Sequence, residues 1–472
     1  MRLIAAVSAV ALLIASPALA KLAKDTSGDG EAGFRALFKE MIETNTAHSD
    51  GSCTLAAERV AARLKAAGYS DADIHLYAPD SAPEDGLVVA TLHGSDASQK
   101  GILLMAHLDV VEAKRSDWTR DPFTLFEENG QFYGRGVADD KGQAAIFADL
   151  MVRYKQDGYR PRRDIKLALT CGEETDGVFN GAQWLSETHK DWIDSGFAIN
   201  EGAYGLFDDK GKPVSFDIEA AEKVYQDFAM EAFNPGGHSS RPRPDNAINE
   251  MAQAIDKVAA YRFPVALNDA SRGYFGQMAG IVGGEDGAAM KALAADPKDA
   301  AAAERLARNP AWNAMLRTTC VTTMISGGHA PNALPQHVAA NVNCRILPGT
   351  PVESVRQALI AAVGDDKVKV TASSAVSPAT PAPPLKSDFL EPLKKTVAEV
   401  YPNVPVVPTM EVGASDAIYT NAVGIPTYGF YGFFEGEDQG NIHGLNEHVG
   451  VKSLMDGRRL FYKLIKLYAD RK

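Results

Sequence analysis

The 472-residue chain lacks the excess of basic residues that nucleic-acid-binding proteins carry. Lys and Arg number 48 against 61 Asp and Glu, which gives a formal net charge of −13, whereas a phosphate backbone selects basic surfaces. Cysteine is also scarce. The four residues Cys53, Cys171, Cys320 and Cys344 are too few for a disulfide scaffold and form no Cys-x-x-Cys pair. We therefore exclude a nucleic-acid partner and interpret the cysteines first as packing residues.

Long apolar runs are missing as well, apart from a short one near the N-terminus. Residues 3–14 are uncharged and mostly apolar, about a dozen residues where a membrane-spanning helix needs roughly 20. Pro17 breaks the run, and Ala18-Leu19-Ala20 has the small-x-small form that signal peptidase accepts. We predict a signal peptide over residues 1–20, cleaved after Ala20. The mature protein would then be secreted or periplasmic, with no membrane span.

Short apolar runs alternate with helical patterns along most of the remaining chain. The apolar content of 45% and charged content of 23% are typical of a globular enzyme with a sizeable core. Strands alternating with helices predict an α/β sheet covered on both faces. The strands expected in this sheet are Ile74–Tyr77, Leu87–Leu92, Ile102–Met105, Ile165–Leu169, Phe197–Ile199, Val404–Val407 and Thr427–Tyr431.

The pattern changes between about residues 216 and 375. The elements expected there, in chain order, are Val224–Ala232, Asn246–Tyr261, Thr318–Met324, His337–Arg345, Val352–Val363 and Val368–Ala372. Their order is β-α-β-β-α-β, a complete two-layer unit. We predict a catalytic domain in two parts, 21–215 and 376–472, and an inserted domain over 216–375. The Ala-rich tract Gly287–Arg308 is expected to be a helical excursion of the inserted domain.

Side chains that could bind a metal follow three of the predicted strands. His107 and Asp109 follow one, Glu173 and Glu174 a second, and Glu201 a third. Ligands of open α/β sheets bind beyond the carboxyl ends of the strands. His107 could bind a metal while Asp109 accepts its other ring N–H. One of the two adjacent glutamates could be a ligand and the other a general base. Surface turns and solvent-exposed charges are the alternatives for each residue alone.

Two further motifs add an acid and a histidine. Asp139 and Asp140 lie in a glycine-rich turn that opens a helix, where an N-cap is the alternative role of either acid. His443 and His448 follow a glycine-rich loop near the C-terminus. The occurrence of all these motifs in one chain favours metal binding over the structural roles, because five strand ends or adjoining loops each offer a side chain that can bind a metal. Two imidazoles and three carboxylates suit zinc with open coordination positions. The sequence therefore predicts a dinuclear metal site.

The motifs resemble those of the aminoacylase, carboxypeptidase S, DapE and glutamate carboxypeptidase family of co-catalytic zinc peptidases, also called metallopeptidase family twenty. The resemblance runs from about residue 30 to 470 and includes the inserted lid. Within the family, Leu316-Arg-Thr-Thr319 and Ile346-Leu-Pro-Gly349 are most similar to the carboxypeptidase S branch. The family resemblance is carried by Ala106-His-Leu-Asp-Val-Val111, Gly134-Arg-Gly-Val-Ala-Asp-Asp-Lys-Gly142, Gly172-Glu-Glu174, Asn200-Glu-Gly202, Gly236-Gly-His-Ser-Ser240, Ala414-Ser-Asp-Ala417 and Ile442-His-Gly-Leu-Asn-Glu-His448.

The resemblance implies a fold and a set of metal ligands. The fold is a catalytic α/β/α zinc-exopeptidase domain with a mixed sheet, interrupted by an inserted ferredoxin-like α+β lid that also serves dimerisation. Asp139 would bridge two Zn²⁺, for which Co²⁺ or Mn²⁺ are substitutes. It is the first acid of the family pattern Asp-x-Lys-Gly, and the family usually has a cis peptide just after it. One metal would be held by His107 and Glu201, the other by Glu174 and His443.

The resemblance also implies the catalytic residues. Glu173 would be the general base, with Asp109 beside the first ligand. His238 would polarise the scissile carbonyl, often from the lid of a partner subunit. Asn332 and Arg345 would hold the substrate carboxylate, which a planar guanidinium suits. From the residues alone, a loop or capping role for His238 and surface roles for Asn332 and Arg345 explain the sequence as well.

The expected protein is a homodimer that hydrolyses a peptide or N-acyl amide bond next to a free carboxylate, as a carboxypeptidase or dipeptidase. An aminoacylase and a non-catalytic binding protein on this fold are the alternatives, and the complete ligand set with Glu173 counts against the second. A related aminopeptidase family has its first histidine and bridging aspartate much closer together and has no lid. We also expect Cys320 and Cys344 to face each other on a hairpin, and we assign no role to Cys171.

Overall fold

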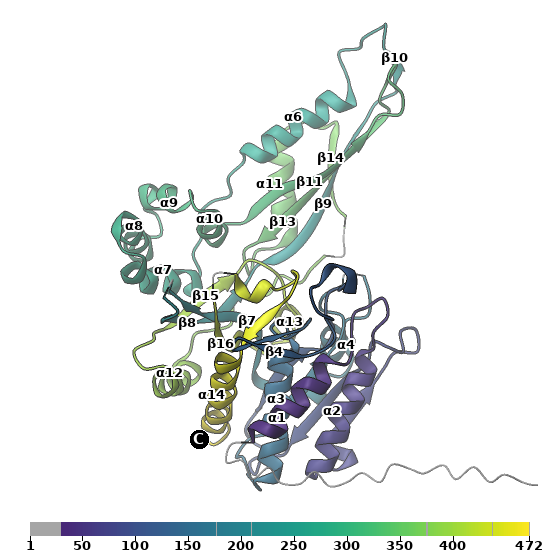
Figure 1. The fold of residues 1–472 in the computed structure, drawn as a ribbon. Coiled ribbons are helices and arrows are strands. Elements are labelled where there is room, and N and C mark those ends of the chain that lie inside the picture. Colours follow the sequence, from purple (N-terminus) through teal and green to yellow (C-terminus); the bar gives the residue numbers. More distant parts are fainter. Residues whose placement is uncertain (1–29, 176, 209, 374–375, 437, 472) are drawn as a thin grey trace, which may run out of the picture.

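The computed structural model describes residues 30–175, 177–208, 210–373, 376–436 and 438–471. Figure 1 shows a lower body built around a large sheet and a smaller sheet that rises above it. The predicted signal peptide lies outside the described residues. Within the described ranges, no helix combines the length and the apolar character needed to cross a membrane.

Eight strands form the large sheet, in the order β1-β2-β6-β3-β7-β16-β8-β15. Neighbours from β6 to β16 run parallel, as do β8 and β15, whereas β1–β2, β2–β6 and β16–β8 are antiparallel. The predicted mixed sheet is therefore confirmed. Its strands are Ile74–Tyr77 (β1), Leu87–Leu92 (β2), Gly101–His107 (β3), Ile165–Thr170 (β6), Ser195–Phe207 (β7), Pro213–Glu222 (β8), Val406–Glu411 (β15) and Thr427–Glu435 (β16).

Helices cover both faces of this sheet, which explains why its central strands are continuous apolar runs. Side chains of β3 alternate between two cores. Ile102 and Leu104 pack under one helical layer, and Leu103 and Met105 pack under the other. The predicted α/β/α layering is confirmed. The first layer contains α1 (Glu31–Ile42), α2 (Cys53–Ala67), α3 (Lys141–Gln156), α12 (Ser387–Val400) and α14 (Val451–Ala469), and the second contains α4 (Gly181–Thr188), α5 (Lys190–Ile193) and α13 (Ala417–Ala422).

The smaller sheet is antiparallel, with the strand order β11-β13-β9-β14. Two helices pack on one of its faces and enclose a separate core that includes Phe228, Val342 and Leu359. This arrangement confirms the predicted ferredoxin-like lid. Its elements are β9 (Val224–Phe233), α6 (Ala247–Ala260), β11 (Thr319–Gly327), β13 (His337–Ile346), α11 (Val352–Val363) and β14 (Val368–Ala372), with the short pair β10 (Gly237–His238) and β12 (Ala333–Leu334) at its tip.

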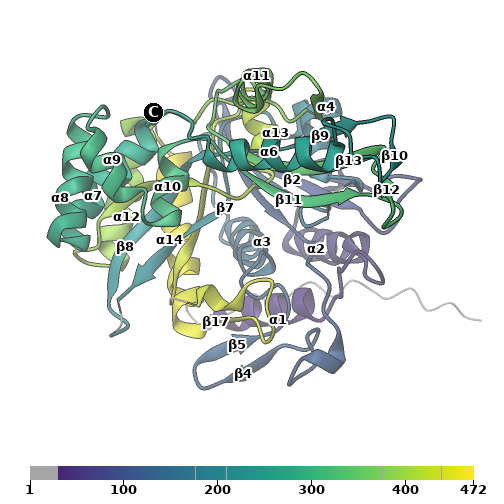
Figure 2. The same cartoon turned by 90° about the horizontal axis from the view of Figure 1, so that it is seen from above.

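The Ala-rich helices pack elsewhere than expected. Helix α7 contacts β15 and β8 of the large sheet, and Phe275, Met290 and Leu306 belong to the main core rather than to the lid core. Figure 2 shows the four helices grouped at that edge of the molecule. They are α7 (Asp269–Val282), α8 (Gly284–Ala295), α9 (Ala300–Leu306) and α10 (Pro310–Leu316). Strand β8 belongs to the large sheet as far as Glu222, and residues 215 and 216, where we placed the first domain boundary, both lie inside it. The domain limits at 215/216 and 375 stay predictions.

Two disulfides involve all four cysteines, and no described cysteine is free. Cys320 lies directly opposite Cys344 in the β11–β13 register, which confirms that they face each other, and the two are bonded. Cys53 is bonded to Cys171 over a sequence separation of 118. The interpretation of the cysteines as packing residues is therefore wrong. The sequence did not reveal the Cys53–Cys171 bond, because a pairing over such a distance depends on the tertiary fold.

Candidate metal centre

Adjacent parallel strands bring four of the predicted residues to one edge of the sheet. His107 is the last residue of β3, Glu173 and Glu174 follow the end of β6, and Glu201 lies within β7. Strands β6, β3 and β7 are parallel neighbours, so their carboxyl ends meet at this edge. The structure thus brings these side chains together as the sequence predicted.

Asp139 reaches the same place from the turn before helix α3. Glu447 holds this turn, since its carboxylate accepts hydrogen bonds from the backbone N–H groups of Gly136, Ala138 and Asp139 at 2.9–3.1 Å. The peptide bond after Asp139 is cis, as the resemblance implied. Asp140 is the N-cap residue of α3, yet its carboxylate does not cap the helix; Oδ2 accepts the backbone N–H of His107 at 3.3 Å.

The five predicted ligands form two groups that share Asp139. In the first, His107 Nε2 lies 3.1 Å from Asp139 Oδ1 and 3.6 Å from Glu201 Oε2. In the second, His443 Nε2 lies 3.2 Å from Asp139 Oδ2 and 3.0 Å from Glu174 Oε2. Within each group the ligand atoms lie within 4.8 Å of one another. Two imidazoles and three carboxylates, one of which is shared by both groups, fit a pair of zinc-type ions.

The electrostatics of the site also fit cations. Burial raises the pKa of the Glu174 and Glu201 carboxyls, although hydrogen bonds to the neighbouring imidazoles oppose this. Burial acts in the same direction on Asp139, but its hydrogen bonds to His107 and His443 lower the pKa of this carboxyl below its usual value. Hydrogen bonds to Asp139 and Glu174 raise the pKa of His443 to about 10. Carboxylates crowded in a buried site repel one another, and divalent cations would relieve that repulsion.

Asp109 contacts two of the ligand segments, although differently from the prediction. Nδ1 of His107 lies 3.0 Å from the carbonyl oxygen of Asp109 and 3.7 Å from its Oδ1. The other carboxylate oxygen, Oδ2, accepts the backbone N–H of Glu174 at 2.9 Å. The backbone oxygen is therefore the nearer partner of the imidazole, because the carboxylate is turned toward the neighbouring loop.

A cleft with a volume of about 460 Å³ opens beside the ligands. Glu173, Glu174 and His443 line it from the large domain, and Tyr225 and Arg345 line it from the lid. Burial, together with the charge of Glu201, raises the pKa of the Glu173 carboxyl well above its usual value. The Arg345 guanidinium lies over the Tyr225 ring, 4.7 Å from its centre. Its buried Nη1 has no hydrogen-bond partner within the described part of the chain.

The other two predicted lid residues lie far from this cleft. His238 and Asn332 are both exposed at the tip of the lid, where the Ser239 N–H donates to the Asn332 carbonyl at 3.0 Å. Strand β10, which contains His238, is at the top of Figure 1, well away from β7 and β16 of the large sheet. The structure thus brings His238 and Asn332 together and separates both from Arg345 and the acids.

Tyr431 is a site residue that the sequence analysis missed. Its hydroxyl lies 3.2 Å from Oδ1 of Asp139, the residue that both groups share. It also lies 3.0 Å from Oε2 of Glu201, which belongs to the group of His107. The ring is buried and stacks on Tyr204. A tyrosine within an apolar strand most often packs, so nothing in the β16 sequence marked this hydroxyl.

Asp416 was also missed. Its buried carboxylate accepts a hydrogen bond from Asn180 Nδ2 at 2.7 Å and one from Thr170 Oγ1 at 3.2 Å, and it lines the cleft. It lies in one of the motifs that carry the family resemblance. That motif was the available signal, but it did not reveal the contact with the loop that follows β6.

Comparisons with known proteins agree with this geometry. The pattern for "Peptidase family M20/M25/M40" matches residues 103–467. The chain is 29% identical over 386 residues to the human N-fatty-acyl-amino acid synthase/hydrolase PM20D1, covering 80% of this chain and 76% of the relative. It is 28% identical over 388 residues to the probable carboxypeptidase S-like 2 of Dictyostelium discoideum, covering 79% and 72%. The fold resembles that of the M20 family metallo-carboxypeptidase Sso-CP2 from Sulfolobus solfataricus, with a TM-score of 0.68, 18% identity and coverage of 92% and 99%.

Proposed function

Because the chain belongs to peptidase family M20/M25/M40, we propose that it is a dinuclear zinc hydrolase that cleaves an amide bond next to a free carboxylate. Membership of the family makes it a metal-dependent hydrolase of the carboxypeptidase or amidohydrolase type. The observation that carries the finer proposal is the pair of ligand groups that share Asp139, together with the cleft that Glu174 and His443 of the second group line with Glu173 and Arg345.

The two ligand groups support a separate place for each of two metals. His107, Asp139 and Glu201 would hold one ion, and Asp139, Glu174 and His443 the other. The imidazole and carboxylate donors support zinc, with Co²⁺ or Mn²⁺ as substitutes. When bound, two such ions polarise the scissile carbonyl and lower the pKa of water.

Glu173 is the proposed general base. It lines the cleft and lies within metal-binding distance of His107 and Glu174, but it belongs to neither of the two groups that share Asp139. Its raised carboxyl pKa suits a residue that accepts a proton from the attacking water and then delivers it to the leaving amine nitrogen. Tyr431 restrains Asp139 and Glu201 during this exchange, because its hydroxyl is within hydrogen-bond distance of both.

Arg345 is the proposed partner of the substrate carboxylate. Its buried Nη1 lacks a hydrogen-bond partner among the described residues, and leaving such a donor unpaired is costly. The Tyr225 ring beneath it keeps the guanidinium in place, and a carboxylate bound to it would lie in the same cleft as Glu173. This supports a substrate that ends in a free carboxylate, such as a small peptide or an N-acyl amino acid.

N-acyl amino acids are the second candidate substrates. The cleft is also lined by Val376, Pro378, Ile418 and Tyr419, which offer apolar surface to the acyl side of the bond. A relative with 29% identity is named an N-fatty-acyl-amino acid synthase/hydrolase, and another is named carboxypeptidase S-like. Both observations are compatible with hydrolysis of either substrate class.

We also propose a homodimer joined through the lids. Strand β11 is at the edge of the lid sheet, and its side chains Val321, Met324 and Ile325 are 59%, 71% and 62% exposed. Exposed apolar edge strands pair readily with another chain. A second lid would cover this edge and could bring His238 of the partner subunit to the cleft, where it would polarise the scissile carbonyl.

Export with removal of residues 1–20 is part of the same proposal. Two disulfides support it, because disulfides persist in oxidising compartments such as the periplasm and the extracellular space. The signal-peptide segment itself lies outside the described residues.

The test is a substrate panel with the purified chain from residue 21 onward. Dipeptides, N-acyl amino acids and their carboxamide-blocked counterparts are compared before chelation, after chelation and after addition of Zn²⁺. We expect hydrolysis of the free-carboxylate substrates to disappear on chelation and to return with Zn²⁺. Full activity in a verified metal-free sample would refute the proposal. The relative rates on the two free-carboxylate classes decide between a peptidase and an aminoacylase.

A further inference from the structure

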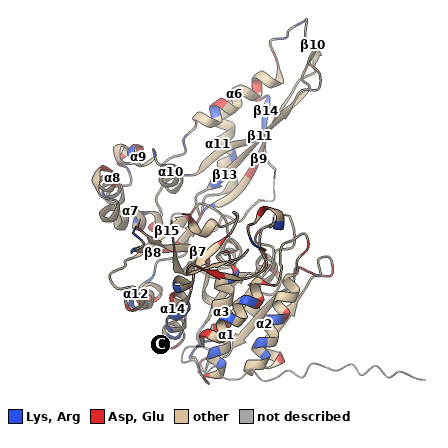
Figure 3. Cartoon of the chain, in the orientation of Figure 1, with Lys and Arg blue, Asp and Glu red and all other residues tan. Residues whose placement is uncertain are grey.

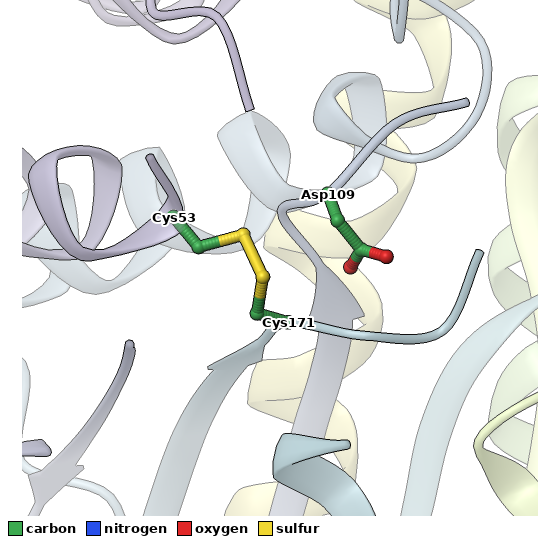
Figure 4. Close-up of side chains that lie close together, drawn as sticks. All are labelled: Cys53, Asp109 and Cys171. Carbon is green, nitrogen blue, oxygen red and sulfur yellow. A yellow bond between two sulfur atoms is a disulfide. The ribbon is translucent and has the colours of Figure 1, made fainter. Parts of the chain in front are cut away.

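A disulfide adjoins the loop that carries the two active-site glutamates. Cys171 is the first residue after β6, two residues before Glu173, and Cys53 is the first residue of helix α2. Both cysteines are buried, with 3% and 2% of their surfaces exposed. Figure 4 shows the bond between the end of β6 and the start of α2, with Asp109 beside it. These three side chains lie within metal-binding distance of one another, but sulfurs bonded to each other are not metal ligands.

Hydrogen bonds close the base of the loop on itself. The Gly181 N–H donates to the Cys171 carbonyl at 2.7 Å, and Asn180 Nδ2 donates to the Gly172 carbonyl at 3.0 Å. Gly172 has a φ of 93°, and a Cβ there would lie 1.9 Å from the Phe179 carbonyl oxygen. These contacts fix the shape of the loop base, but all of them lie between residues that flank the loop. They do not fix its position relative to helices α1, α2 and α3.

Two contacts connect the loop to that helical side of the sheet. The Glu174 N–H donates to Asp109 Oδ2 at 2.9 Å, and the disulfide joins Cys171 to α2. Helix α2 packs on α3, and α3 begins directly after the turn that presents Asp139. The disulfide therefore attaches the segment of Glu173 and Glu174 to the same helical layer that positions Asp139.

We propose that the Cys53–Cys171 disulfide is a positioning element of the hydrolytic site. It positions the Glu174 carboxylate among the residues that would hold the metal also bound by Asp139, and it positions Glu173 where this residue would accept a proton from the attacking water. This inference rests on the proposed function, because it concerns the residues assigned there. A displacement of about 1 Å in a catalytic group can cost 10²-fold in rate, so a covalent anchor two residues from the base affects turnover as well as folding.

The second disulfide supplies a matched control. Cys320–Cys344 also joins two segments covalently, but it lies within the lid and its cysteines do not line the cleft. We compare the variants Cys53→Ala/Cys171→Ala and Cys320→Ala/Cys344→Ala with the unmodified protein at saturating Zn²⁺, below the unfolding temperature of both variants. The readouts are kcat and KM on the best substrate of the panel, oligomeric state, and a Co²⁺ titration followed by absorption spectroscopy.

We expect the Cys53→Ala/Cys171→Ala variant to lose about 10- to 100-fold in kcat with little change in KM, because the lid residues that bind the carboxylate are untouched. One of its two Co²⁺ ions should bind about 10- to 100-fold more weakly, since a ligand has lost its support. The lid variant, compared in the same oligomeric state as the unmodified protein, should match it in kcat and in the Co²⁺ titration. A loss confined to thermal stability would have no such effect on the kcat of the folded enzyme.

Equal kcat and equal Co²⁺ titrations in the two paired variants would overturn the inference. Failure of the Cys53→Ala/Cys171→Ala variant to fold would overturn it too, because the bond would then support the whole domain rather than the loop. If the unmodified protein shows no metal-dependent hydrolysis, the proposed function fails instead. The Co²⁺ titration would still decide whether the bond positions Glu174.

Discussion

Replacing Tyr431 with phenylalanine tests whether this hydroxyl supports the metal ligands. The substitution removes an oxygen that lies 3.2 Å from Asp139 Oδ1 and 3.0 Å from Glu201 Oε2. The ring would keep its stack on Tyr204, whose centre is 4.3 Å away. The perturbation is therefore confined to one donor and the two carboxylates beside it.

The expected magnitude follows from the charge of the acceptors. A hydrogen bond to a charged group contributes about 1.5–3 kcal/mol, and about 1.4 kcal/mol corresponds to a tenfold change in binding. Loss of the hydroxyl should weaken zinc binding by about 10- to 100-fold, the range seen when ligands lose an outer hydrogen-bond partner. We expect weaker rather than tighter binding, because the hydroxyl holds the two carboxylates in place and their orientation is lost with it.

The assay is a competitive zinc titration of folded protein, with kcat measured at saturating zinc. Tyr428→Phe is the matched control, because it removes a hydroxyl from the same strand that donates to the Pro384 carbonyl at 2.6 Å instead of a ligand. The control should lower stability by about 1 kcal/mol and leave zinc affinity unchanged. Equal zinc affinities for the two variants would refute the assigned role of Tyr431.

Three further predictions concern the proposed catalytic residues. Glu173→Gln should keep its zinc and lose about 10²- to 10⁴-fold in turnover; loss of zinc, as expected of His107→Ala, would mean that Glu174 is the base. Arg345→Ala should raise KM for free-carboxylate substrates by about 10- to 100-fold, and equal activity of the unmodified enzyme on carboxamides would rule this out. His238→Ala should lower kcat by about 10²- to 10³-fold with its metal retained. Mixing it with Glu173→Gln should restore activity in heterodimers; no recovery after verified subunit exchange would place His238 at the site of its own chain.

The ligand positions could be predicted because they combine two local signals. Each proposed ligand has metal-binding chemistry, and all of them except His443 lie near the end of a predicted strand or in the turn that opens a helix, where ligands of α/β sheets gather. The supporting residues carry no such combination. Tyr431 lies in an apolar strand, and the Cys53–Cys171 pairing depends on where α2 packs. Their roles come from tertiary neighbours that the sequence does not specify locally.

The placement of the Ala-rich helices shows the same limit. Proximity in sequence suggested that Gly287–Arg308 belonged to the lid. Alanine gives a strong helix tendency but little indication of which surface a helix covers. The larger apolar residues Phe275 and Met290 decide the packing, and they are buried in the main core at the edge formed by β8 and β15. The chain thus returns from the lid to the large sheet and back before the lid is complete.

The positions of Asn332 and Arg345 restrict how a complete site can form. Strand β13 starts at His337, eight residues before Arg345, a separation of roughly 26 Å at 3.3 Å per residue. Asn332 lies on the far side of His337, near β10 and β12 at the tip of the lid. A rigid lid that closes over its own catalytic domain moves both ends together and cannot place both residues on one carboxylate. If both residues bind substrate, Arg345 and Asn332 must come from different subunits, and His238, which lies beside Asn332, must then accompany it across the dimer.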